Sequence, residues 1–121
     1  MKARYIQRGD AIDIIAVNDL NAGEIVHLGN LIGVTRLPIK AGTLGTLALS
    51  GVFDVVKPIG ISFQQGSNVF WNGHAAHSGF LLGIAIQNAA AESDHVRILL
   101  NSTANSKNEN SSGVDAEWQP L

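Results

Sequence analysis

The sequence predicts an all-β protein, a compact small β-barrel or β-sandwich of about eight short strands. Short apolar runs rich in Val, Ile, Leu and Phe recur along the chain, separated by residues that favour turns. The 121 residues include 13 glycines and only three prolines, a composition that suits frequent tight turns. The helix formers between 88 and 94 make too short a run to hold a helix alone.

The first half of the chain predicts four strands. Asp13 gives the second of these runs a weak polar and apolar alternation, and Gly29-Asn30 predicts a hairpin turn between the third and the fourth. A loop at 38–42 follows. The predicted strands are Ala3–Gln7, Ala11–Val17, Glu24–Leu28 and Leu31–Leu37.

The second half predicts one long strand and three shorter ones. Gly51 interrupts the long run, where we expect a bulge or a bend. Asn72-Gly73 predicts a tight turn, because both residues accept the left-handed backbone conformation. The predicted strands are Leu44–Val56, Val69–Trp71, Phe80–Gln87 and His95–Leu100.

The composition changes at residue 101 and divides the chain into two parts. We expect residues 1–100 to form one β-rich domain, and no repeat of solenoid period is visible within it. Residues 101–121 are rich in Ser and Asn, which predicts a flexible tail in the free protein. Trp118 in that tail either folds loosely back on the domain or belongs to an arm that orders on meeting a partner.

Composition and charge exclude several function classes. The chain has no cysteine, so disulfides and thiolate chemistry are excluded. A formal net charge of −2 with scattered Lys and Arg predicts no nucleic-acid partner. No apolar run is long enough for a membrane span or a secretory signal. We therefore expect synthesis and folding in a cytoplasm.

The residues that could carry chemistry do not form a convincing catalytic pattern. His74 and His77 have the spacing of a metal pair only in a helix, and they follow a predicted turn, so we interpret them as loop residues. The acidic residues between 10 and 24 fit solvated or turn-capping roles better than acid–base catalysis. The sequence thus predicts no enzyme activity, no metal site and no cofactor.

An ordered series of short motifs resembles a known family. The series is Tyr5–Asp10, Ala22–Val26, Gly33-Val34, Ala41–Thr43, Ser50–Lys57, Gly66–Trp71, Leu82–Ala85 and Val96–Leu100. It is similar to the small phage proteins of the DUF2190 family, which are capsid cement or decoration proteins. The resemblance extends from Ala3 to Leu100, whereas the polar tail has no counterpart in it.

The resemblance implies a structural phage protein that binds the outer surface of the assembled capsid and stabilises the coat lattice. Its partners would be the major capsid protein and further copies of itself, most simply in a homotrimer. The protein would be made in the host cytoplasm and reside on the outside of the virion.

Two surfaces are candidates for these contacts. The N-terminal segment combines charged and apolar side chains in the composition of an exposed arm, although it could equally be the first strand of the fold. The run 80–86 is too uniformly apolar for a strand with one face in solvent, and a subunit interface would explain it. The candidate capsid-binding residues are Lys2, Arg4, Tyr5 and Ile6, and the candidate interface residues are Phe80, Leu82, Ile84 and Ile86.

A second reading of the sequence is a β-sandwich module that binds carbohydrate or a host surface. An exposed Trp71 beside Asn72 and His74 could stack on a sugar ring. A hydrolase ranks third, because it would need a His and a carboxylate brought together by the fold.

Overall fold

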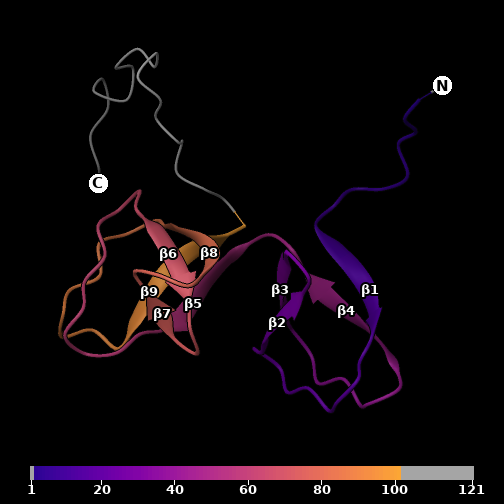
Figure 1. Cartoon of the computed structure of the whole chain (residues 1–121), viewed down its shortest axis with the longest axis horizontal. Helices are drawn as coiled ribbons and strands as arrows, with labels where there is room; N and C mark the ends of the chain where they lie inside the picture. Colours follow the sequence, from indigo (N-terminus) through magenta and orange to yellow (C-terminus); the bar gives the residue numbers. More distant parts are fainter. Residues whose placement is uncertain (1, 102–121) are drawn as a thin grey trace. The chain divides into compact units, whose positions relative to one another are not determined.

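The computed structural model describes residues 2–101, which form two compact units, shown in Figure 1. Unit 1 runs to Gly51 and unit 2 begins at Val52. The strands of unit 1 are β1 (Ala11–Ile15), β2 (Ile25–Leu28), β3 (Leu31–Thr35) and β4 (Leu44–Ala48). Those of unit 2 are β5 (Val52–Val56), β6 (Asn68–Trp71), β7 (Ala75–Ala76), β8 (Phe80–Ala85) and β9 (His95–Leu100).

Each unit contains one antiparallel sheet. The strand order is β1-β4-β3-β2 in unit 1 and β5-β9-β8-β6-β7 in unit 2. Both sheets are open rather than closed into a barrel, and every element in the described residues is a strand, a bridge or a turn. The all-β prediction is confirmed. No helix in the described part of the chain is long and apolar enough to cross a membrane.

The two sheets follow the same plan. In each unit the first strand pairs with the last, the last pairs with the strand that precedes it in the chain, and that strand pairs with the second. The short β7 is the only addition in unit 2, at the edge beside β6. The structure thus contains a repeat of topology within one chain, which the side-chain pattern of the sequence does not display.

The same loop closure completes both units. Leu20 and Ile39 exchange two backbone hydrogen bonds of 2.8 and 2.9 Å, and Phe63 and Ala89 do the same at 3.0 and 2.8 Å. Each bridge joins the loop before the second strand to the loop before the last one. Ile39, Phe63 and Ala89 are all buried, so the bridges lie over the cores of their units.

Two glycines at matching positions let the strands pack closely. Gly33 pairs with Val26 in β2, and Gly83 pairs with Val69 in β6. A Cβ on Gly33 would overlap the side chain of Leu47, and one on Gly83 would overlap the backbone of Leu99. Any larger residue at either site would push the last strand of its unit out of place.

Alternation along the strands builds the cores. In β9, His95, Arg97 and Leu99 are exposed and the residues between them are buried. The largest fully buried side chains are Ile32, Thr35 and Leu47 in unit 1 and Val69, Leu82, Val96 and Ile98 in unit 2. This period of two is the pattern of a sheet that buries one face.

Two of the predicted strands are wrong. The predicted strand Leu44–Val56 is two strands, β4 and β5, which belong to different sheets. The chain leaves β4 through Gly51, whose φ of 124° is open to glycine but not to other residues. The apolar pattern continues on both sides of this glycine and conceals the break.

The predicted strand Ala3–Gln7 is also absent, since residues 2–8 have no regular structure and are exposed. Its two large apolar residues, Tyr5 and Ile6, are neighbours, so a strand would place them on opposite faces and bury only one. One domain over residues 1–100 remains a prediction, and the predicted flexible tail lies outside the described residues except for Asn101.

A buried lysine organises the loops of unit 2. Lys57 is only 4% exposed, and its Nζ donates hydrogen bonds to the carbonyl oxygens of Pro58, Ile61 and Ala91 at 3.1, 2.6 and 3.3 Å. The three donors of the ammonium group therefore each have an acceptor. The lysine ties the loop after β5 to the loop before β9.

We predict that Lys57→Met destabilises the protein by about 1–3 kcal/mol, because the carbonyl oxygens lose their donor while the aliphatic volume is kept. Urea unfolding followed by circular dichroism measures the loss. Lys40→Met, at an exposed position, is the matched control and should change stability by less than about 0.5 kcal/mol. Equal stability of the two variants would contradict a structural role for Lys57.

Candidate functional site

The histidines of the predicted turn serve structural contacts. Nδ1 of His74 lies 3.0 Å from the carbonyl oxygen of Ala75, and Nε2 of His77 lies 2.8 Å from that of Ser62. The His77 ring also meets the ring of Phe63 edge to face, with centroids 4.8 Å apart. Within residues 2–101, no group of three His, Asp or Glu side chains could hold a metal ion.

The acidic residues of the N-terminal half do not converge. Asp10 forms an ion pair with Arg8 at 3.2 Å. Asp19 Oδ1 accepts a hydrogen bond from the backbone N–H of Ala41 at 2.8 Å, and Glu24 Oε1 accepts one from Asn21 at 3.4 Å. The turn-capping interpretation is confirmed for Asp19 and Glu24.

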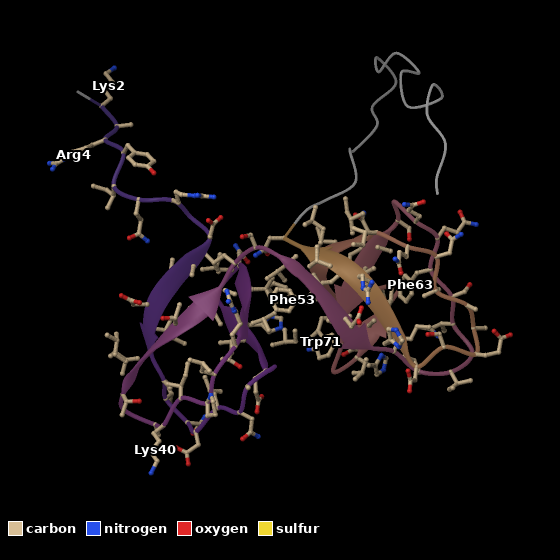
Figure 2. All side chains as sticks on the ribbon, turned by 180° about the vertical axis from the view of Figure 1, so that it is seen from behind. Lys2, Arg4, Lys40, Phe53, Phe63 and Trp71 are labelled. Atoms are coloured by element: carbon tan, nitrogen blue, oxygen red, sulfur yellow. The ribbon has the colours of Figure 1, made fainter. Side chains whose placement is uncertain are left out.

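The candidate capsid-binding residues lie in the segment before β1. Figure 2 shows Lys2 and Arg4 on this segment. Tyr5 and Ile6 are 79% and 75% exposed, and neither cation forms an ion pair within the described residues. A segment with two cations and two exposed apolar side chains has the composition of an arm that binds another surface.

The candidate interface residues lie along β8 and just beyond it. Leu82 is fully buried in the core of unit 2, whereas Phe80, Ile84 and Ile86 are half-buried. The apolar run reflects the central place of β8 between β9 and β6. A contact with a second copy through these residues stays a prediction.

The residues of the alternative carbohydrate site lie at the end of β6. Trp71 is half-buried and lies opposite Phe80 in β8 and Ala75 in β7. The His74 ring is hydrogen-bonded to the carbonyl oxygen of Ala75. For a sugar ring, the described residues here provide only the exposed part of the Trp71 indole ring.

An exposed strip on β5 and β9 is a further candidate contact surface. Three directly opposite pairs of exposed residues follow one another across the two strands, and the middle one is an ion pair. The pairs are Val52 with Leu99, Asp54 with Arg97, and Val56 with His95. Val52 and Val56 are 54% and 60% exposed, and β5 is an edge strand of its sheet. The sequence did not lead us to predict this strip, although Asp54 at the centre of the apolar run 52–56 indicates that one face of the run meets solvent.

The ion pair of the strip is bidentate. Arg97 Nε donates to Asp54 Oδ1 at 2.9 Å and Arg97 Nη2 donates to Oδ2 at 3.1 Å. These hydrogen bonds lower the pKa of the Asp54 carboxyl below its ordinary value, although partial burial acts in the opposite direction. The pair joins residues that lie directly opposite in the register of β5 and β9.

Comparison with known proteins identifies the family of this chain. A family model described as phage cement protein matches residues 6–100, a range that includes the strands β1 to β9. No curated protein and no solved structure matches the chain. The chain belongs to the phage cement protein family, which confirms the family resemblance of the sequence and a structural role in a phage.

We predict that Asp54→Asn lowers stability at pH 7 and that the difference from wild type disappears in acid. Because the pKa of Asp54 is lowered on folding, its contribution is present above the unfolded-state value of about 3.9 and is lost as the pH falls through the folded-state value. Urea midpoints at pH 7 and at about pH 2 test this.

Asp13→Asn is the matched control for this experiment, since Asp13 occupies the same place in β1 and faces Thr46 instead of an arginine. A difference between Asp54→Asn and wild type that persists unchanged at low pH would contradict the ion-pair account.

Proposed function

We propose that this protein binds the outer surface of the assembled phage capsid as a homotrimer and stabilises the lattice of the major capsid protein. The observation that carries the proposal is the family match over residues 6–100. It is supported by exposed apolar side chains on β5 and on the segment before β1, which include Val52, Val56, Tyr5 and Ile6.

The physical basis of cementing is linkage. A protein that binds the assembled lattice more tightly than free coat subunits shifts the equilibrium toward the assembled shell. The same contact repeats over the shell, and an oligomer can engage several contacts at once, so weak individual contacts add to strong retention. This work requires a stable β framework and exposed contact surfaces.

The contact with the coat protein would begin at the N-terminal arm, Lys2 to Ile6. Its backbone is exposed and lies outside both sheets, so it is available to add a strand to a sheet edge of a coat subunit. Lys2 and Arg4 would direct it to an acidic coat surface with a salt-sensitive association rate.

We predict that deleting residues 1–4 weakens binding to purified shells while the melting temperature stays within about 2 °C, since the described part of this segment makes no strand contacts. Cosedimentation with shells and thermal unfolding are measured in parallel. The double variant Lys2→Gln, Arg4→Gln separates charge from backbone and should reduce the salt dependence of binding. Unchanged sedimentation of the deletion variant would remove the arm from the interface.

We predict a homotrimer, with Phe80, Ile84 and Ile86 beside Leu82 at the interface. Light scattering at tens of micromolar should give three times the chain mass of 12.8 kDa. A strict monomer under these conditions would contradict this assembly and leave the family assignment untouched.

A further inference from the structure

Unit 1 contains a groove of about 850 Å³ on one face of its sheet. Leu44, Thr46 and Ala48 of β4, with Ala11 of β1, form its floor, and the loop between β3 and β4 forms its wall. All the residues that line it belong to unit 1. Leu37 in the wall is 74% exposed and Leu44 in the floor is 66% exposed. Two leucines this open in one groove make it a candidate contact surface.

Hydrogen bonds hold the wall of this groove in place. The backbone N–H of Ala41 donates to Asp19 Oδ1 at 2.8 Å, and the hydroxyl of Thr43 donates to the carbonyl oxygen of Lys40 at 2.6 Å. The double bridge between Leu20 and the loop ties the wall to the rest of unit 1. The groove is therefore formed before a partner binds, and binding requires little ordering of the loop.

Charges of opposite sign lie on the two sides of β4 on this face. Arg36 and Lys40 line the groove, and Arg36 directly follows β3. Asp13 lies in β1 directly opposite Thr46, so its side chain is on the same face, and β1 and β3 are on opposite sides of β4. None of these three charged residues forms an ion pair with any residue between 2 and 101. Figure 2 shows Lys40 on the loop of unit 1.

The matching face of unit 2 has its charges paired internally. There Asp54 of β5 lies opposite Arg97 of β9 and forms the bidentate ion pair with it. In unit 1 the place of the arginine is taken by Thr46, so Asp13 has no cation opposite it. The cations of this face of unit 1 are in the groove wall instead. Unit 1 thus exposes an acidic side and a basic side, neither of which is neutralised by the described residues.

A face with this pattern is complementary to itself. A two-fold axis between two copies makes each patch meet its counterpart in reverse order, so the acidic side of one face meets the basic side of the other. The exposed leucine of the wall is a ridge beside a groove, and the same axis places the ridge of each copy against the groove of the other.

We propose that the groove face of unit 1 binds the groove face of a second copy. Asp13 of each copy lies beside Arg36 and Lys40 of the other. Leu37 of each copy enters the groove of the other and covers Leu44. The contact is separate from the one proposed at β8, and it does not rest on capsid binding. It is small, so we expect it in solution at concentrations on the order of hundreds of micromolar.

Charge exchange between two variants tests the reciprocal contact. Asp13→Lys makes the face wholly basic, and Arg36→Glu with Lys40→Glu makes it wholly acidic. In sedimentation velocity, the parent protein should gain mass over this concentration range, and each variant alone should show an association constant about tenfold lower. An equimolar mixture of the two variants should restore the association, because unlike charges then meet at both contacts.

The controls change the net charge equally at exposed positions outside the groove lining. Glu92→Lys in unit 2 matches Asp13→Lys, and Lys2→Glu with Arg4→Glu matches the acidic variant. Both controls should associate as the parent does. Melting temperatures within about 2 °C of the parent value show that the variants are folded. The gain in mass is measured from the species present at tens of micromolar, so the result is the same whether that species is a trimer or a monomer.

A parent protein whose mass does not rise with concentration would overturn the proposal, as would a mixture that associates no better than its components. Loss of shell binding by both variants with no change in self-association would also overturn it, since the groove would then serve the coat protein.

Discussion

The fold of each unit depends on the double hydrogen bond that joins its two long loops. The first two strands lie on opposite sides of the central pair, so the chain between them must cross the sheet. The bridges Leu20–Ile39 and Phe63–Ala89 hold that crossing against the loop before the last strand. In unit 1 the Ile39 side chain lies against Gly45, where a Cβ would overlap it. The paired hydrogen bonds of each bridge thus hold both the order of the strands and the loops that cover the core.

The two units secure the same loops with different side chains. After the first strand, the backbone N–H of Ala16 donates to Thr43 at 3.2 Å and that of Lys57 donates to Asp94 at 2.9 Å. Unit 1 has a small buried methyl group at this point, whereas unit 2 has an ammonium group bonded to three carbonyl oxygens. A longer loop with more free carbonyl groups requires donors, and Lys57 supplies them.

Local pattern was enough to predict most strands, because alternation and turn residues are properties of neighbours in sequence. The hairpin at Gly29-Asn30 and the strand His95–Leu100 are examples. The repeated topology could not be predicted, since it resides in backbone pairing and few residues other than Gly33 and Gly83 are the same at matching positions. The partners Asp54 and Arg97 are 43 residues apart, so the exposed strip required the strand order as well as the sequence.

The edge strands β1 and β5 each carry an aspartate at the centre, Asp13 and Asp54. Exposed edges with apolar side chains invite copies of a protein to join their sheets into aggregates. If two copies paired in a centred antiparallel register through β1, Asp13 would face Asp13, and the same holds for Asp54 in β5. The two Asp13 carboxylates would repel each other at the middle of the new ladder, whereas the charge of each Asp54 is already balanced by Arg97. Such repulsion would disfavour pairing of two copies through the edge strand β1.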